Sequence, residues 1–219
     1  MLSLLLGMLF VLFAVPSEAS AQDLTIVSGA TFSGSGRIRV KGNVVNSGVS
    51  EATSIPGTLY LGGDAQELGT DGAGALTVNT LSLSGNGTKA SNVNVEVTDS
   101  LHINVGNGNT FDISDREITI GKLSGITSGG LSGNGNAVLR FTRNDGSVQI
   151  IPGGEYAAQI VLSGNGEKRL GGDLTLTAGS VTIQAGVSLN IEAGRTLTVR
   201  GDLNAIGSLV VDGILNLEE

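Results

Sequence analysis

The sequence lacks cysteine and tryptophan, and its 219 residues include one histidine, three prolines and only 3% aromatic residues. The absence of cysteine excludes a disulfide scaffold, a thiolate zinc site, an iron–sulfur cluster and a cysteine nucleophile. A single histidine excludes a metal site built from several histidines. Collagen is excluded because proline is scarce and the glycines follow no three-residue period.

Positive charge is also scarce, with 12 Lys and Arg against 20 Asp and Glu and a formal net charge of −8. An acidic surface repels phosphates, and the few basic residues form no run, so we expect no nucleic-acid partner. Disorder is not expected either, because 40% of the residues are hydrophobic and only 15% are charged. These proportions indicate a folded chain with an aliphatic core.

Glycine is abundant: 35 of 219 residues, or about 16%, are glycine, more than twice its usual share. Near the C-terminus it opens short units of the form glycine, spacer, apolar, variable, apolar. These units are Gly194–Arg200, Gly201–Ile206, Gly207–Asp212 and Gly213–Leu217. The alternation predicts strands with one buried face, and the regular glycines predict a turn after each strand.

A longer repeat is also present. The sequence Leu-Ser-Gly-Asn-Gly occurs at Leu83–Gly87, Leu131–Gly135 and Leu162–Gly166, and the first and third copies begin blocks that match at an offset near 79 residues. The duplicated blocks cover about 83–123 and 162–203. Self-similarity of this kind is typical of solenoids. We therefore predict an all-β parallel β-helix with three short strands per rung.

The run from Ile160 to Leu176, followed by Gly-x-Leu-x-Val units, resembles the glycine-rich β-helical repeats of secreted and surface proteins of Gram-negative bacteria. These include adhesin-like, autotransporter-like and type IX-exported proteins. The resemblance covers roughly Gly57 to Leu217. It implies a right-handed parallel β-helix outside the cytoplasm, often within a longer protein, and it leaves the export route open.

The N-terminus differs from the rest of the chain. Leu2–Val15 is an apolar run that ends at Pro16, and Ala19–Ala21 forms a small-x-small cleavage pattern. This predicts a signal peptide over residues 1–21, cleaved before Gln22, and hence a secreted or cell-surface protein with no transmembrane span after cleavage. The alternative is a buried N-terminal helix. Residues 22–56 are then expected to form an N-terminal cap with the first rungs, and residues 57–219 the repeat β-helix.

The sequence contains two candidate catalytic sites, and we interpret both as surface groups without a catalytic role. The acidic cluster Asp112–Glu117 resembles the grouped carboxylates of carbohydrate-active β-helix enzymes, but alternation with Phe111 and Ile113 directs Asp112 outward. Asp115 falls where a turn is expected. His102 lies between Leu101 and Ile103, which is also an outward position. We interpret these side chains as solvated surface groups.

Three short motifs are likewise interpreted as turns. Gly62–Asp64 and Gly171–Asp173 resemble the start of a calcium-binding nonapeptide, but neither continues it. Arg200–Asp202 spells the integrin-binding tripeptide at a point where the repeat requires glycine. Asn86, Asn134 and Asn165 each stand between two glycines, and asparagine tolerates left-handed backbone. No catalytic, cofactor-binding or metal-binding residue is predicted, and no cofactor is expected.

Asn144–Gly146 separates two strand-like segments, Val138–Arg143 and Ser147–Ile151. An Asp-Gly pair between strands is a hairpin signal, so this segment is either a hairpin that leaves the coil or a corner with a longer loop.

The sequence therefore favours a non-catalytic structural or adhesive module of the cell surface or the extracellular space. The alternative is a carbohydrate-binding or carbohydrate-active β-helix protein. Ice binding is a third idea, because Thr175, Thr182 and Thr198 are expected to face outward, although Asn190 interrupts that series. The expected partners are surface glycans, other surface proteins, or a second copy that associates end to end through the apolar last rung.

Overall fold

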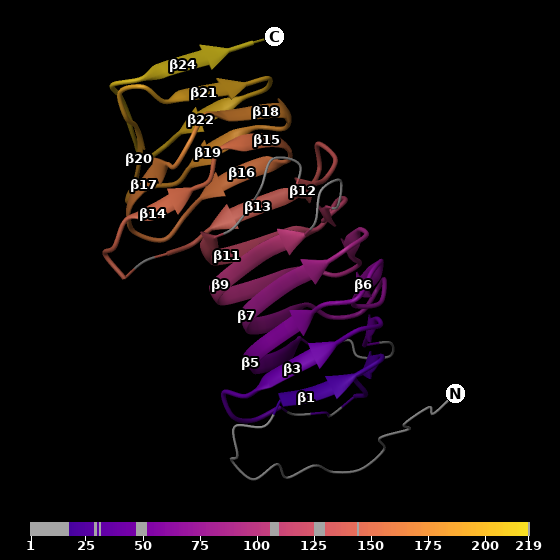
Figure 1. The fold of residues 1–219 in the computed structure, drawn as a ribbon. Coiled ribbons are helices and arrows are strands. Elements are labelled where there is room, and N and C mark those ends of the chain that lie inside the picture. The colour runs from indigo at the N-terminus through magenta and orange to yellow at the C-terminus, as the bar shows by residue number, and fades with distance from the viewer. Residues whose placement is uncertain are drawn as a thin grey trace.

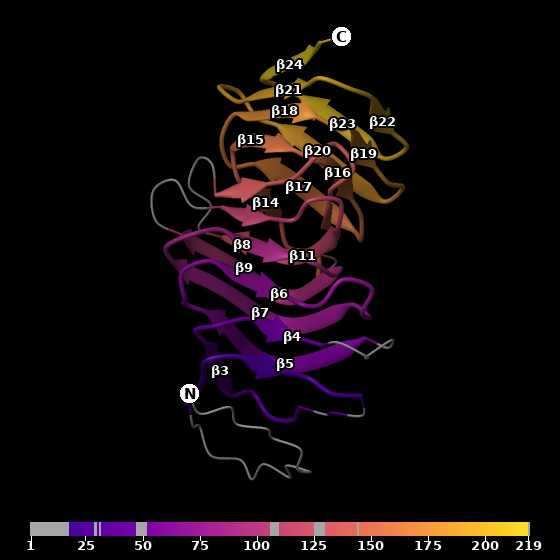
Figure 2. The ribbon, with the colours of Figure 1, turned by 90° about the vertical axis from the view of Figure 1, so that its right-hand side faces the viewer.

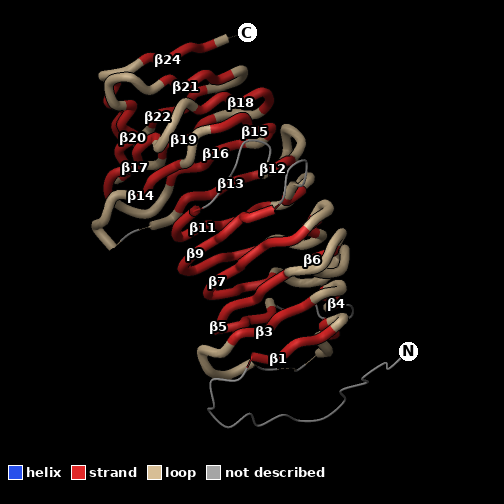
Figure 3. Tube along the Cα trace, viewed as in Figure 1, coloured by secondary structure: helices blue, strands red, loops and turns tan. Residues whose placement is uncertain are grey.

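The computed structural model describes residues 18–28, 30, 32–46, 52–105, 110–124, 130–143 and 145–218. Over these residues the chain winds into a parallel β-solenoid, with stacked strands from one end to the other (Figure 1). The described residues contain strands and loops but no helix (Figure 3). The predicted all-β parallel solenoid is therefore confirmed.

One ten-stranded parallel sheet, sheet A, runs the length of the solenoid. Its strands in spatial order are β1 (Glu18–Ala21), β3 (Arg37–Val40), β5 (Thr53–Leu61), β7 (Leu76–Gly85), β9 (Val95–Val105), β11 (Glu117–Ser124), β13 (Val138–Phe141), β16 (Gln159–Leu162), β19 (Val181–Ile183) and β22 (Leu203–Ala205).

Three shorter parallel sheets form the other sides (Figure 2). Sheet B contains β2 (Leu24–Thr25), β4 (Val44–Val45), β6 (Gln66–Leu68), β8 (Lys89–Ser91), β10 (Phe111–Asp112) and β12 (Leu131–Ser132). Sheet C contains β14 (Gln149–Ile151), β17 (Gly166–Leu170), β20 (Val187–Ile191) and β23 (Ser208–Val211). Sheet D contains β15 (Gly154–Ala157), β18 (Leu174–Ala178), β21 (Thr196–Val199) and β24 (Ile214–Leu217).

Each turn of the coil has three sides in both halves. In the N-terminal half the long strands of sheet A bend at register shifts, such as the one between Val78 and Thr80, and so cover two sides while sheet B forms the third. In the C-terminal half the two sides separate: sheet A continues the first limb, and sheet C follows the second limb, since β14 contacts β11. Sheet D continues sheet B through the contact of β15 with β12.

The core consists of side-chain ladders in which each rung adds one residue. Alternation along the strands turns every second side chain inward, and the parallel register stacks these side chains on one another. One ladder of fully buried residues is Ile55, Val78, Val97, Ile120, Phe141, Leu162 and Ile183. The narrow interior is thus filled mainly by aliphatic groups, as the composition suggested.

The corner at Asn144–Gly146 is not a hairpin. The flanking strands β13 and β14 belong to different sheets, and each pairs in parallel with strands of other rungs. Gly146 has a positive φ of 80°, which suits a sharp corner, and Asn144 lies outside the described residues. The loop is therefore a long corner between two sides of one rung.

The predicted signal peptide lies mostly outside the described residues, which begin at Glu18. Its last four residues form β1 and pair with β3, so cleavage before Gln22 would leave β3 at the edge of sheet A. The boundary expected between residues 56 and 57 falls at the bend of β5. No helix in the described part of the chain has the length and hydropathy needed to cross a membrane.

The repeated sequence occupies different sides of the coil in its first and third copies. Leu83–Gly87 leads from sheet A into β8, which carries Lys89 in sheet B. Leu162–Gly166 leads from sheet A into β17, which carries Lys168 in sheet C. Because sheet C follows the second limb of sheet A, the third copy is displaced by one side of the coil relative to the first.

Candidate functional site

Two lysines lie inside the solenoid, in columns where the following rung places an apolar side chain, Phe111 after Lys89 and Leu189 after Lys168. Lys89 and Lys168 are both 0% exposed. Each stands in register with a buried glutamine on the preceding rung, Gln66 for Lys89 and Gln149 for Lys168. We call each of these pairs a Gln–Lys clamp, because each holds one corner residue by both of its backbone polar groups.

In the first clamp the corner residue is Gly63. Its N–H donates to Oε1 of Gln66 at 2.7 Å, and its carbonyl accepts from Nζ of Lys89 at 2.8 Å. The same ammonium donates to the carbonyls of Asp64 and Asn86. A Cβ on Gly63 would lie 1.9 Å from the carbonyl oxygen of Lys41, so this corner requires glycine.

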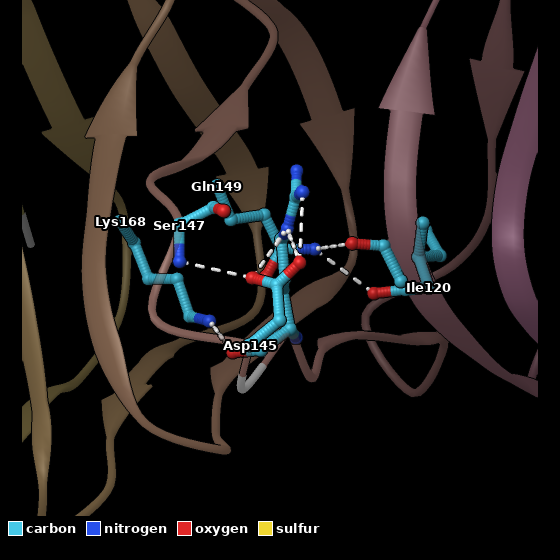
Figure 4. A network of polar contacts seen from close by, with 7 residues as sticks. Ile120, Asp145, Ser147, Gln149 and Lys168 are labelled. Atoms are coloured by element: carbon cyan, nitrogen blue, oxygen red, sulfur yellow. Dashed lines mark hydrogen bonds and ion pairs between the residues drawn. The ribbon is translucent and has the colours of Figure 1, made fainter.

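In the second clamp the corner residue is Arg143, which is held by Gln149 and Lys168, both labelled in Figure 4. Its N–H donates to Oε1 of Gln149 at 3.1 Å, and its carbonyl accepts from Nζ of Lys168 at 2.7 Å. The amide nitrogen of Gln149 reaches back to the preceding rung and donates to the carbonyls of Ile120 and Gly121 at 2.9 and 2.7 Å. The clamp thus joins the corner of one rung to the strand below it.

Burial lowers the pKa of both lysines, because removing an ammonium from water disfavours its charged form. For Lys168 burial is the main cause, the charge of Arg143 adds to it and Asp145 opposes it, which brings the pKa to about 8. For Lys89 the nearby charge of Asp64 partly opposes the effect of burial. Four backbone carbonyls accept from Lys89, so its ammonium is well solvated by the protein itself.

The second clamp supports an open pocket of about 430 Å³ at the seam where the second limb of sheet A ends at β11 and sheet C begins. This seam pocket is lined by Glu96, Val97, Thr98, Asp99, Thr119, Gly121, Lys122, Thr142, Arg143 and Asp145. Its volume lies within the range of about 300 to 1,000 Å³ that is usual for small-molecule sites. It therefore forms a candidate binding site on the side of the solenoid.

Two of the residues that line the seam pocket, Arg143 and Asp145, form an ion pair. The guanidinium of Arg143 donates to both carboxylate oxygens of Asp145, through Nε at 2.9 Å and through a terminal nitrogen at 2.9 Å, and Asp145 also accepts from the N–H of Ser147. These bonds hold the pKa of Asp145 well below its usual range. Asp145 is thus a fixed anion, unsuited to transferring protons near neutral pH.

The acidic cluster does not converge on one point. Asp112 faces outward from β10, and its Oδ1 accepts from the N–H of Ser114, which has a positive φ of 42°. Arg116 pairs with Asp71 at 2.5 Å. Glu117 pairs instead with Arg140 on the next rung, at 2.6 Å, and this hydrogen bond lowers the pKa of Glu117. Asp112 thus lies on a strand and Asp115 in the turn that follows it.

The remaining sequence candidates lie at outward positions or corners. His102 is exposed on β9, as predicted. Asp173, in the second Gly-Gly-Asp sequence, accepts from the N–H of Thr196 on the next rung at 2.8 Å. Arg200 is exposed and pairs with Glu218 at 2.8 Å, and a Cβ on Gly201 would lie 2.1 Å from a backbone carbonyl oxygen. Glycine in that tripeptide therefore has a steric cause.

At two of the three asparagines between glycines, Asn86 and Asn165, the chain bends, but the predicted left-handed backbone falls on their neighbours. Gly85 and Gly87 flank Asn86 with φ of 85° and 73°, and Gly164 and Gly166 flank Asn165 with φ of 80° and 86°. Glycine takes these conformations without the Cβ clash that asparagine would suffer. The expected threonine series does not share a face either, because Thr182 lies in sheet A whereas Thr175 and Thr198 lie in sheet D.

The Gln–Lys clamps and the seam pocket are the features that sequence reasoning missed. A signal for the lysines was present: Lys168 alternates with Leu170, which places it at an inward phase of its strand. The pocket had no such signal, because it depends on where one sheet ends and another begins. Within the described ranges, no three His, Cys, Asp or Glu side chains come together as metal ligands.

Comparison of the chain with known protein families, with curated proteins and with solved structures gave no match.

Proposed function

We propose that this chain is a non-catalytic structural or adhesive module that works at the cell surface or outside the cell. The observation that supports the proposal best is that its buried lysines and glutamines form hydrogen bonds with the protein backbone. Lys89, Lys168, Gln66 and Gln149 bond to the backbone of neighbouring rungs, and so brace the coil. A stacked core with internal braces suits a rod that presents its outer faces to partners.

The predicted leader peptide and the resemblance to bacterial surface repeats support an extracellular location. Mass spectrometry of the exported protein tests this, since cleavage before Gln22 gives a chain that begins at that residue. An intact N-terminus in the cell interior would contradict the proposed location.

Adhesion and catalysis can be separated in one experiment. Beads coated with the purified protein are applied to surfaces carrying mixed polysaccharides or mucin, and the medium is assayed for new reducing or unsaturated sugar ends. We expect retention of the beads without release of sugar ends. Release that disappears on changing Asp112 and Asp115 to asparagine would contradict the non-catalytic proposal.

The seam pocket favours the second candidate, a carbohydrate-binding or carbohydrate-active protein. Its lining residues include Thr98, Thr142, Asp99 and Lys122, which carry hydroxyl, carboxylate and ammonium groups, and the hydroxyl of Thr98 donates to Asn79. Such mixed donors and acceptors suit a sugar. The same bead assay tests this candidate: retention lost in Asp99→Asn but not in Asp112→Asn would place binding in the pocket, and release lost in Asp99→Asn would place catalysis there.

End-to-end self-association is a further proposal for partners. The rung formed by β22, β23 and β24 exposes large apolar side chains, including Ile206 at 66%, Ile214 at 56% and Leu217 at 60%. Exposed apolar groups beside open strand edges favour pairing with another rung. Sedimentation velocity should show concentration-dependent dimers that Ile214→Lys weakens, and a monomer at every concentration would contradict the proposal.

A further inference from the structure

On one outward face of the solenoid every side chain is neutral or positively charged, and each can donate a hydrogen bond. This face is formed by the second limb of sheet A, across β3, β5, β7, β9 and β11, which lie side by side in Figure 1. We call it the donor face, and its side chains are Arg37, Arg39, Thr58, Tyr60, Thr80, Ser82, Ser100, His102 and Lys122.

The parallel register arranges this face in two columns. The first column is Arg37, Thr58, Thr80, Ser100 and Lys122, and the second is Arg39, Tyr60, Ser82 and His102. The residues between them, such as Leu59 and Leu81, are 0% exposed, so the columns lie on the outward side of the strands, where Ser100 is covered by its neighbours and only 6% exposed. With strands about 4.8 Å apart, the four steps from Arg37 to Lys122 span roughly 19 Å along the solenoid axis.

The composition of this face stands out against the whole chain. The sequence has 20 acidic residues against 12 basic ones, yet none of the nine side chains is a carboxylate. Other outward positions do carry acids, including Glu96 on the first limb of sheet A and Glu67 and Asp112 on sheet B. A carboxylate also marks one end of the donor face, since Asp99 lines the seam pocket together with Lys122.

The exposed charges lie at the two ends of the columns, with hydroxyls between them. Arg37 and Lys122 are exposed, Arg39 stacks over the ring of Tyr60 with 4.6 Å from its guanidinium carbon to the ring centroid, and the hydroxyl of Tyr60 is hydrogen-bonded to Ser84. The stack and this hydrogen bond hold the tyrosine ring in place. Cations bind carboxylates and sulfates, and hydroxyls bind sugar hydroxyls, so a linear acidic glycan matches both features.

We propose that the donor face binds a linear polyanionic glycan, with carboxylate or sulfate groups, laid along the solenoid axis from Arg37 to Lys122. The proposal rests on the proposed adhesive function, because it names the class of ligand that an adhesive module would hold. A flat row of donors on an otherwise acidic protein also gives selectivity, since the surrounding carboxylates repel an anion that lies elsewhere.

The test measures binding of the full chain to immobilised heparin, which is sulfated, and to polygalacturonate, which is carboxylated. Dextran serves as the neutral glycan and single-stranded DNA as the polyanion without sugar acids. We expect binding to at least one acidic glycan, no binding to dextran, weaker binding to DNA, and an affinity that falls as salt is raised. The comparison of the two acidic glycans shows which anionic group is preferred.

The decisive variant is the double change Arg37→Gln with Lys122→Gln, and its matched control is Arg195→Gln, which removes an exposed charge from a corner before sheet D. We expect the double variant to lose roughly tenfold or more in affinity, because charged hydrogen bonds are lost, and the control to bind as the wild type does. All three proteins should melt at similar temperatures, because the altered side chains face solvent.

Three results would overturn the inference: no binding to either acidic glycan, equal losses in the double variant and in Arg195→Gln, or binding to DNA as tight as to the glycans. If the first occurs while coated beads still adhere to mucin, the ligand assignment fails and the adhesive proposal stands. If the acidic glycans bind through Arg37 and Lys122 but the beads do not adhere, the adhesive proposal fails and the binding face stands.

Discussion

Replacing Lys168 by methionine should change how the stability of the protein depends on pH. Methionine has nearly the length of lysine and no charge, so it can fill the same inward position of β17. In the wild type the ammonium is fully buried and donates to the carbonyl of Arg143 at 2.7 Å. Burial, together with the charge of Arg143, lowers the pKa of Lys168 from 10.5 to about 8.

The direction of the effect follows from proton binding. The unfolded chain holds the Lys168 proton up to its ordinary pKa of 10.5, whereas the folded chain releases it near 8. Between these values the unfolded state binds more protons, so the free energy of unfolding rises with pH. One pKa unit corresponds to about 1.4 kcal/mol, so the whole shift corresponds to about 3 to 4 kcal/mol, and this is reached only when the pH spans both values.

Urea unfolding followed by circular dichroism measures this difference. From about pH 7.5 to 9.5 the free energy of unfolding of the wild type should rise by about 1 to 2 kcal/mol relative to that of Lys168→Met. Lys89 also contributes to the slope, but it does so equally in both proteins. The measurement stays below pH 10. Above pH 10 stability should fall as pH rises, because burial raises the pKa of Tyr156 in the folded protein.

Two further variants separate charge from packing. Lys122→Met removes an exposed lysine and should keep the wild-type slope. Lys168→Ala should also flatten the slope, but it leaves a cavity and should lower the stability by about 2 to 4 kcal/mol at neutral pH. A wild-type slope in Lys168→Met would refute the reasoning, because the buried ammonium would then not titrate as described.

Four other substitutions, one of them a control, test the ladders, the corners and the surface pairs. Leu162→Ala, in the buried ladder, should cost about 2 to 5 kcal/mol in urea unfolding, whereas Leu217→Ala, which is 60% exposed, should change stability by no more than about 0.5 kcal/mol. Gly201→Ala would place a Cβ 2.1 Å from the carbonyl oxygen of Gly179, so we expect a loss of about 1 to 3 kcal/mol in the same assay; a wild-type value would contradict the steric argument. Glu117→Gln should reduce the loss of stability in acid, because a hydrogen bond from a guanidinium lowers the pKa of Glu117 and so stabilises the fold above its ordinary value of 4.5. Acid titrations of the two proteins that coincide would show that this pair contributes nothing.

Much of the fold was predictable because its cause is local. Alternation such as Leu174, Thr175, Leu176 specifies a half-buried strand, and the glycine at 201 follows from a steric limit that recurs at several corners. In a parallel stack, residues of similar type occupy the same position on successive rungs. The repeat of glycines and the alternation of apolar residues together therefore indicate the coil.

The functional surfaces were less predictable because they depend on register between rungs. Arg37 and Lys122 are 85 residues apart in the sequence, and only the stacking of five strands places them in one column. The clamp at Arg143 likewise needs Gln149 and Lys168 from two different rungs. Outward residues carry no periodic signal, because solvent accepts nearly any polar side chain.

The displacement of the repeated sequence by one side bears on how such a coil could acquire new surfaces. The same sequence, from leucine through the Asn-Gly corner to a buried lysine, leads into sheet B at Lys89 and into sheet C at Lys168. The two copies therefore differ in phase by one side and its corner, about a third of a turn, although each duplicated block is longer and covers about 83–123 or 162–203. Inserting or deleting one side with its corner would leave the inward ladders filled while turning every later outward face to a different direction, so a solenoid of this type could re-aim a binding face without rebuilding its core.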